Sequence, residues 1–499
     1  MQRVVDVSVM RISDRETIAH GISGRELMWR AAQGIMKSHL WCGPVAIVCG
    51  CGNNAGDGFA LSVLFKQAEI DCTVFLLSSE FSEDGGYYYE KCKEIGVSIA
   101  DFTEETRFDG YSEIVDCIFG TGFHGAVTGK YATAIDAINA SGKFVVSADI
   151  NSGLNGDSGL CSCAVHSDLT VSIGFLKNGL LLNRAKDYIK RLVNVDIGID
   201  LYGECRYLCE ADDFREILKT RMQDSHKGIY GYVSVMGGCN EYSGAVKLAN
   251  LSCSALRAGC GVAQLIVPAS LRESVSPYLL ESTLALLPDE NGHLLYHPET
   301  LDRALARQAA LAVGMGWGSS PSYAQILSHV LSKYAMPTVI DADGLNTLST
   351  MDLSILQKTN CRVVLTPHLK EMERLSGIPV EEIRCNPVRV AENFAKAYGL
   401  IVLLKGTCTV ITDGEKTYLV NRGCAGMATA GSGDVLSGIL VGLLGYAPYD
   451  ALTVACGAYI AGLAGELAEQ KTNPISMTAS DTVSCIADAV SVMLGNGKI

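Results

Sequence analysis

Short runs of apolar and β-branched residues recur along the whole chain, and stretches with helical spacing of apolar positions separate them. In the first half the runs lie at 45–50, 72–77, 113–119, 144–150, 169–174 and 191–198, while residues 59–68 and 131–140 suit helices. This alternation is typical of an α/β domain built on a mostly parallel sheet.

The pattern becomes charged and irregular between residues 205 and 222, and strand–helix alternation then resumes. We therefore expect two α/β domains, at residues 1–210 and 211–499. The second set of strand-like runs lies at 232–238, 263–268, 310–316, 338–343, 361–368 and 400–406.

Composition narrows the possible partners. The 499 residues include 40 Lys and Arg against 54 Asp and Glu, so the formal net charge is −14, and five basic residues never occur in a row. This argues against a nucleic-acid partner, although helix N-termini in an acidic protein still bind phosphorylated small molecules.

The 19 cysteines are odd in number and many lie in apolar runs, and the charged N-terminal segment does not resemble a signal peptide. A cytoplasmic location with reduced thiols is expected.

Two strongly apolar segments require a membrane check. Residues 435–444 and 451–463 each fall short of the roughly 18–20 residues that span a bilayer, and Pro448 and Asp450 separate them. We expect two helices buried in a domain core, and no membrane partner.

Three polar segments follow strands of the first half. Residues 49–60 are rich in glycine and contain Asn53, Asn54 and Asp57. Asp116 stands before the next segment, and Asp149 and Ser152 lie in the third. Ligands of parallel sheets bind at the carboxyl ends of the strands, so the three segments are expected to face one cleft. The oxygen atoms of Asn54, Asp116 and Ser152 suit a hard cation. Asp149 is the acid–base candidate, and a turn or cap carboxylate is the alternative.

These segments resemble the YjeF N-terminal family, the NAD(P)H-hydrate epimerases. The resemblance rests on NNAGDG at 53–58, Asp116 with GTGFHG at 120–125, and DINSGLNGDSG at 149–159, with Ala55 and Asn151 departing from the family pattern. It implies a Rossmann-like three-layer domain, a potassium ion held by Asn54, Asp116 and Ser152, and substrate contacts from Asn53, Asn54, Ala55, Gly56, Asp57, Gly120, Thr121, Gly122, Phe123, His124, Gly125, Ala126 and Asp149. Similar domains also serve as binding modules without catalysis.

A second candidate site lies at 424–445. Gly431 and Gly433 precede Asp434, and an apolar helix follows at once. Backbone N–H groups at such a helix start hold an anion, and the adjacent carboxylate is placed to deprotonate a phosphoryl acceptor. A structural helix cap is the alternative interpretation of Asp434.

This segment resembles the G-S/T-G-D motif of the ribokinase-like superfamily. With residues 226–261, 313–318, 339–346, 365–375 and 405–411 it resembles the YjeF C-terminal family, the ADP- or ATP-dependent NAD(P)H-hydrate dehydratases. The resemblance implies a ribokinase-like domain, Asp434 as catalytic base, and Mg²⁺ with ADP as phosphoryl donor. It also implies substrate contacts from Ala245, Gly316, His368 and Asp434, and nucleotide contacts from Lys405, Gly406, Thr407, Cys408, Thr409 and Gly433.

Together the two resemblances imply repair of hydrated NADH and NADPH, in which one domain interconverts the R and S hydrates and the other dehydrates the S form. The alternative is a ribokinase-like kinase of a vitamin precursor with a non-catalytic N-terminal module. A homo-oligomer that acts on these small molecules is expected.

Overall fold

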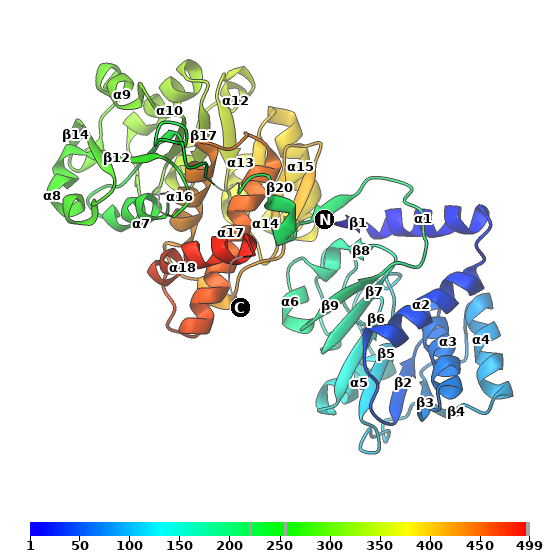
Figure 1. Ribbon diagram of the computed structural model, residues 1–499. Helices are drawn as coiled ribbons and strands as arrows, with labels where there is room; N and C mark the ends of the chain where they lie inside the picture. The colour runs from blue at the N-terminus through cyan, green and yellow to red at the C-terminus, as the bar shows by residue number, and fades with distance from the viewer. Residues whose placement is uncertain (219–220, 254–256, 496–499) are drawn as a thin grey trace. The chain divides into compact units, whose positions relative to one another are not determined.

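The computed structural model describes residues 1–218, 221–253 and 257–495. The predicted linker positions 219–220 and the predicted motif positions 254–256 lie outside the described residues. The chain forms two compact units, one of residues 2–206 and one of Met1 with residues 207–499. The predicted α/β class of both units is confirmed (Figure 1).

The N-terminal unit is built on a parallel sheet in the order β4-β3-β2-β5-β6-β7-β9. Its strands are β2 (Val45–Cys49), β3 (Cys72–Leu76), β4 (Ser98–Asp101), β5 (Glu113–Cys117), β6 (Phe144–Ala148), β7 (Leu169–Ile173) and β9 (Leu192–Val195). Its helices are α1 (Val7–Ala19), α2 (Gly24–Ser38), α3 (Asn53–Gln67), α4 (Glu83–Glu94), α5 (Lys130–Ala140) and α6 (Ala185–Tyr188).

Alternate residues of the central strand β2 enter different cores, which makes this unit three-layered. Val45 and Ile47 pack in a cluster with Phe59 and Phe65 of α3, whereas Val48 packs with residues of α5 on the other face. Successive strand side chains point to opposite faces of a sheet, so a strand buried on both sides is apolar at nearly every position. A further parallel pair, β1 (Gln2–Val5) with β8 (Leu176–Lys177), lies outside this seven-stranded sheet and anchors the start of α1.

The C-terminal unit has a parallel sheet with an antiparallel margin. The order is β13-β12-β11-β16-β17-β18-β19-β20-β21-β10, and β20 is antiparallel to both its neighbours. The strands are β10 (Arg206–Leu208), β11 (Tyr232–Met236), β12 (Val262–Pro268), β13 (Thr283–Leu287), β16 (Ala310–Val313), β17 (Pro337–Ile340), β18 (Arg362–Leu365), β19 (Ile401–Leu404), β20 (Thr409–Thr412) and β21 (Thr417–Val420), with a separate hairpin β14 (Asp289–Glu290) and β15 (His293–Leu294).

The helices of this unit are α7 (Ser243–Cys253), α8 (Arg272–Val275), α9 (Pro298–Leu305), α10 (Pro321–Lys333), α11 (Asp343–Leu348), α12 (Ser354–Lys358), α13 (Leu369–Ser376), α14 (Val380–Cys385), α15 (Pro387–Tyr398), α16 (Ser432–Leu444), α17 (Ala451–Lys471) and α18 (Ala479–Met493). The core joins α7, α16, α17 and α18 to the central strands.

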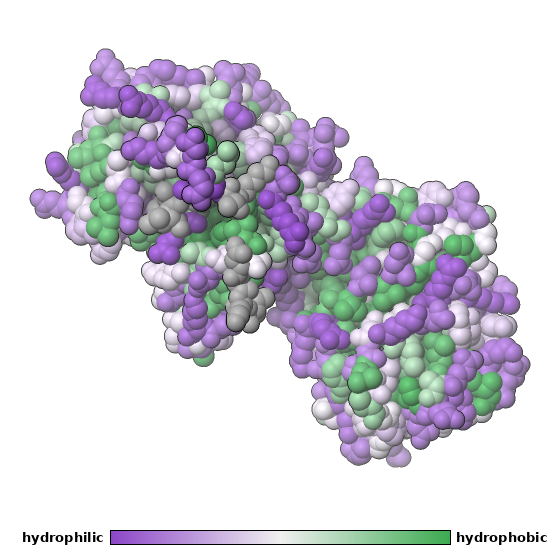
Figure 2. Space-filling model, in the orientation of Figure 1, coloured by the Kyte–Doolittle hydropathy of each residue, from purple (hydrophilic) through white to green (hydrophobic). Residues whose placement is uncertain are grey.

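The apolar segment that was expected to be too short to span a membrane is longer in the structure. Helix α17 has 21 residues because it continues past residue 463, so among the described residues it meets a span's requirements of length and composition. However, 83% of its most apolar 18-residue window is buried inside the protein. This burial fits the expected core helix. Polar residues cover much of the visible face of each unit (Figure 2).

Candidate functional sites in the two units

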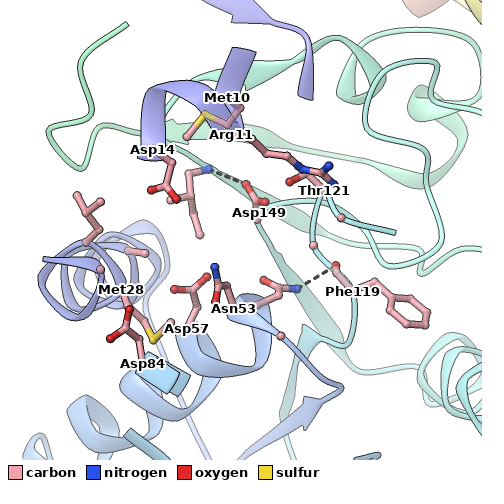
Figure 3. Close-up of a pocket in the computed structure, with 18 of the residues that line it drawn as sticks. Met10, Arg11, Asp14, Met28, Asn53, Asp57, Asp84, Phe119, Thr121 and Asp149 are labelled. Carbon is pink, nitrogen blue, oxygen red and sulfur yellow. Dashed lines mark hydrogen bonds between the residues drawn. The ribbon is translucent and has the colours of Figure 1, made fainter. Parts of the chain in front are cut away.

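The N-terminal unit holds a cavity of about 650 Å³ beyond the carboxyl ends of β2, β5 and β6 (Figure 3). Helices α1 and α2, the start of α3 and the loops after β5 and β6 form its walls. The predicted residues that line it are Asn53, Asn54, Asp57, Gly120, Thr121, Gly122, Phe123, His124 and Asp149. The three polar segments therefore meet at one place, as parallel strands with adjacent carboxyl ends require.

Four predicted contacts lie elsewhere. Helix α3 begins at Asn53, so Ala55 and Gly56 are helical, and both are buried away from the cavity. A Cβ at Gly56 would lie 2.5 Å from Met28 Cε and 2.9 Å from Gly85 Cα, so this glycine serves close helix packing. The Ala55 departure causes no strain because this position needs no positive φ. Gly125 and Ala126 are exposed and do not line the cavity.

Asp149 has an unusual backbone at the end of β6. Its φ is +65°, a region that residues other than glycine rarely adopt. The backbone N–H of Asp149 donates to Val171 O at 2.8 Å, which ties the residue to β7 and holds this conformation. Retained strain of this kind clusters at functional sites. The side chain reaches the cavity and is 16% exposed.

Lys177 is the partner of Asp149, and sequence reasoning did not identify it. Its ammonium donates to Asp149 Oδ1 and to Ile173 O at 2.7 Å, and its side chain is only 1% exposed. A lysine this buried requires a charged partner. The signal in the sequence was a single Lys inside the apolar stretch 173–182.

Further carboxylates line the same cavity. Burial, together with the negative charges of Asp149 and Asp14, raises the pKa of Asp57 well above its usual value, and the charge of Lys177 opposes this. Burial also raises the pKa of Asp14, with contributions from Asp149 and Asp84. Figure 3 shows Asp14, Asp57 and Asp149 bordering one space. Burial and the charges of neighbouring carboxylates thus both disfavour the ionised forms of Asp57 and Asp14.

The three predicted cation ligands belong to one hydrogen-bond network. Asn54 Nδ2 donates to Phe119 O at 2.9 Å, and its Oδ1 is buried with no hydrogen-bond partner among the described residues. Ser152 Oγ donates to Asp116 Oδ1 at 2.5 Å and accepts the N–H of Phe119 at 2.8 Å. Burial raises the pKa of Asp116, while bonds from Ser152, Ile118 and Ser147 act against this rise. Among the described residues of this network, Asn54 Oδ1 is therefore the buried oxygen left without a partner, and Asp116 is the carboxylate closest to it along the network.

The second departure, Asn151, stabilises the loop that carries Ser152. Asn151 is fully buried, and its Nδ2 donates to Val165 O at 2.9 Å and to Ser167 Oγ at 3.0 Å. Its Oδ1 accepts from Thr170 Oγ1 at 2.6 Å. Because these bonds replace the rigidity of a proline turn, the loop keeps a fixed shape.

In the C-terminal unit Asp434 lies in the first turn of α16. Gly431 caps this helix with φ +95°, a left-handed conformation that suits glycine. Burial raises the pKa of Asp434 to about 7, with Asp341 and Asp343 adding to the rise and Lys405 opposing it. A carboxyl group with this pKa is suited to act as a base near neutral pH.

Lys405 joins two acidic residues beside this helix start. Its Nζ lies 2.9 Å from Asp341 Oδ1 and 3.7 Å from Glu371 Oε2. Burial raises the pKa of Asp341, yet it is lowered overall because the charge and hydrogen bond of Lys405 and the bond from Ser437 outweigh burial. A Cβ at Gly433 would lie 3.5 Å from Asp341 Oδ2 and 3.6 Å from Lys405 Nζ. Lys405 thus offers a fixed positive charge beside the N-terminus of α16, where anions bind.

The other predicted nucleotide contacts divide by exposure. Gly406 and Thr407 are exposed in the turn after β19, and Thr409 is half-buried at the start of β20. Cys408 is buried with 3% exposure, so its side chain belongs to the core. Only its backbone is placed to contact a ligand at this turn.

The predicted substrate contacts of this unit lie in two places: His368 is at the start of α13, and Ala245 lies opposite Gly316. His368 caps α13, since its Nδ1 accepts the N–H groups of Lys370 and Glu371 at 3.1 and 3.2 Å, and its ring is 51% exposed. The proton of the neutral ring is therefore assigned to Nε2. Ala245 and Gly316 face each other, because a Cβ at Gly316 would lie 3.0 Å from Ala245 Cβ.

Asp341 and Asp343 were not predicted as site residues, although they flank the turn after β17. Ala342 between them has φ +48°. Asp343 Oδ2 accepts the N–H of Gly318 at 2.8 Å, which links this turn to the loop after β16. The two carboxylates in the run 339–346, with only Ala342 between them, were the available signal.

Comparisons with known proteins match the two parts of the chain to two families. Residues 233–488 match the family described as NAD(P)H-hydrate dehydratase, and residues 24–179 match the family described as YjeF-related protein N-terminus. A bifunctional NAD(P)H-hydrate repair enzyme of Moorella thermoacetica is 34% identical over 457 residues, which cover 88% of this chain and 85% of the relative. One of Archaeoglobus fulgidus is 33% identical over 486 residues, which cover 96% and 97%.

The chain also resembles a solved structure in its fold. A ribokinase-like superfamily protein of Enterococcus faecalis aligns with a TM-score of 0.50 at 23% identity, covering 60% of this chain and 99% of that one. The predicted ribokinase-like fold is confirmed.

Proposed function

The chain belongs to the bifunctional NAD(P)H-hydrate repair enzymes, and from this premise we propose a division of labour between its two units. The N-terminal unit interconverts the R and S hydrates of NADH and NADPH. The C-terminal unit dehydrates the S hydrate with ADP, giving NAD(P)H, AMP and phosphate. The observation that carries the proposal is Asp434, a carboxyl group with a pKa of about 7 at a helix N-terminus beside Lys405.

In the N-terminal unit, the contact between Asp149 and Lys177 supports reversible proton transfer. The hydroxyl-bearing carbon of the hydrate is bonded to the ring nitrogen, as in a carbinolamine. Asp149 takes the hydroxyl proton, the carbon–nitrogen bond opens to an aldehyde, and Lys177 protonates the nitrogen. Reversal of these steps on the other face of the aldehyde gives the opposite epimer: Asp149 returns its proton to the new hydroxyl group, and Lys177 regains its proton from the nitrogen.

A potassium ion would be held by Asn54, whose Oδ1 is buried without a partner among the described residues, with Asp116 compensating its charge. Ser152 would join them after turning its hydroxyl hydrogen away from Asp116. The ion would fix the oxygens of the substrate.

In the C-terminal unit, Asp434 accepts the proton of the substrate hydroxyl, and the oxygen attacks the β-phosphorus of ADP. The bond from that phosphorus to the AMP oxygen breaks, while Lys405 and the helix N–H groups hold the phosphate charge. The carbon–oxygen bond then breaks, and the departing phosphate takes a proton from the neighbouring carbon, which forms the ring double bond. Asp434 returns to its carboxylate form by releasing its proton to solvent. Magnesium bound with the nucleotide, with Asp343 as an oxygen ligand, would neutralise phosphate charge.

The test uses purified S hydrate with ADP and magnesium. The expected result is equal amounts of dihydronicotinamide, AMP and inorganic phosphate, with no reaction for Asp434→Asn. A stable phosphorylated product without dihydronicotinamide would contradict the proposal and support a vitamin-precursor kinase. The predicted homo-oligomer and cytoplasmic location stay predictions, which size-exclusion chromatography and cell fractionation test.

A further inference from the structure

The cavity of the N-terminal unit is poorly suited to the phosphates of a dinucleotide. Its charged lining contains more acidic than basic side chains: Asp14, Asp57, Asp84 and Asp149 against Arg11 and Lys177. Lys177 is buried and bound to Asp149, so its charge is already compensated. Arg11 is therefore the remaining strong cation of the lining.

Arg11 reaches this cavity from α1 and is available to a ligand. Its Nη2 lies 3.7 Å from the position that a Cβ of Gly122 would take, and Figure 3 shows it extending towards Thr121. Within the described part of the chain, Arg11 forms no ion pair or hydrogen bond, and its side chain is exposed. By contrast Arg15, one turn later on α1, pairs with Glu16 at 3.1 Å and does not line the cavity.

The loop from Gly120 to Gly122 connects the reacting end of the cavity to Arg11. A Cβ at Gly120 would lie 3.7 Å from Asp149 Oδ2, so this end of the loop adjoins the acid–base pair. The other end, two residues later, adjoins the guanidinium. In the substrate, one ribose separates the nicotinamide ring from the diphosphate. The acid–base pair and Arg11 therefore adjoin opposite ends of this short loop, as ring and diphosphate lie at opposite ends of the ribose.

We propose that Arg11 binds phosphate of the hydrated dinucleotide, with the bridging diphosphate as the favoured group, and so sets which way the substrate lies. This inference rests on the proposed epimerase activity. The guanidinium presents a planar fork of donors that matches phosphate oxygens. The carboxylates that line the cavity disfavour phosphate away from Arg11, which leaves the uncharged nicotinamide end for the space beside Asp149.

The kinetic test compares Arg11→Ala, Arg11→Lys and the matched control Arg15→Ala in the full chain. We expect Arg11→Ala to raise the epimerisation KM about tenfold with little change in kcat. Arg11→Lys should raise the KM less than Arg11→Ala does, and Arg15→Ala should leave the KM unchanged. An equal rise for both hydrates identifies the bridging diphosphate, whereas a rise for the NADPH hydrate alone identifies the 2′-phosphate. An unchanged KM in Arg11→Ala would overturn the proposal.

A second readout does not require activity, because the exposed Cys51 lines the same cavity. Its alkylation rate, followed by peptide mass spectrometry, reports occupancy. We expect NAD⁺ to protect Cys51 and Arg11→Ala to raise the protecting concentration about tenfold, while protection by phosphate-free nicotinamide riboside stays unchanged. Protection that depends on Arg11, in a protein that does not catalyse epimerisation, would contradict the proposed function and support this inference. No protection by NAD⁺, or equal protection of both proteins, would overturn it.

Discussion

The two sites use the same elements in different arrangements. Each has an aspartate beyond the carboxyl ends of parallel strands and a nearby buried or half-buried lysine. In the N-terminal unit the lysine contacts the acid–base candidate itself, Lys177 with Asp149. In the C-terminal unit Lys405 pairs with a neighbour, Asp341, while Asp434 has a pKa raised to about 7.

This difference matches the chemistry that we propose for each site. Epimerisation removes a proton and returns it, so a carboxylate and an ammonium in direct contact serve both directions. Phosphoryl transfer needs a base for the hydroxyl and a separate cation for the phosphate. Pairing Lys405 with Asp341 keeps the cation close while leaving Asp434 able to accept a proton.

The largest expected effect separates the two activities completely. Asp434→Asn should lower the dehydratase kcat by roughly 10³-fold or more, because the amide does not accept the hydroxyl proton. Epimerisation, followed by chromatographic separation of the hydrates, should keep its wild-type rate. A parallel loss of both activities would show that the sites are not independent.

Breaking the N-terminal pair should affect both activity and stability. Asp149→Asn should slow epimerisation by roughly 10²–10³-fold. It should also lower the free energy of unfolding of this unit by about 3 kcal/mol, because the buried Lys177 loses its charged partner. The double variant Asp149→Asn with Lys177→Met should recover stability in urea unfolding without recovering activity. Recovered activity in the double variant would refute the acid–base role.

The pairing of Lys405 with Asp341 leads to a prediction about how dehydratase activity depends on pH. A base with a pKa of about 7 must lose its proton, so dehydratase kcat/KM should rise with pH and reach half its maximum near pH 7. Asp341→Asn removes a negative charge that raises the pKa of Asp434. The substitution also frees Lys405 from its ion pair, and the positive charge of Lys405 lowers the pKa of Asp434. The rise should therefore move to lower pH. A profile that moves upwards, or stays in place, would contradict this electrostatic assignment.

The smallest expected effect concerns the cation. Asn54→Ala removes the buried oxygen that has no partner in the described part of the chain, so epimerisation should fall by roughly tenfold and lose any stimulation by potassium over sodium. Rates measured in potassium and sodium salts of equal ionic strength test this, with the exposed Asn473→Ala as a control. Stimulation that survives Asn54→Ala would remove Asn54 from the cation site.

The sequence predicted the parallel strands well because their residues are apolar at nearly every position. Every strand-like run that we predicted in the first half coincides with a strand of the sheet. The antiparallel pair β20 and β21 was missed because its strands have only four residues each and β20 has threonine at both ends, although Asp413 and Gly414 between them were a turn signal. The start of α3 was placed six residues too late because Gly56 and Gly58 are poor helix formers, and tertiary packing overrides that preference.

The candidate sites were predictable only where residues share a local motif. Asp149 and Asp434 stood beside glycines in short polar segments. Lys177 lies 28 residues from Asp149 along the chain. The position of Arg11 depends on the pairing of β1 with β8, because this pairing brings the start of α1 to the cavity. Such long-range contacts leave no periodic signal in a single sequence.

The most direct test of two independent sites in one chain is the recovery of dihydronicotinamide absorbance from mixed R and S hydrates with ADP, magnesium and potassium. Wild type should recover the whole pool rapidly, Asp149→Asn only the S fraction before slowing, and Asp434→Asn none. An equimolar mixture of the two variants should again recover the whole pool rapidly. Rapid recovery of the whole pool by Asp149→Asn alone would contradict the account.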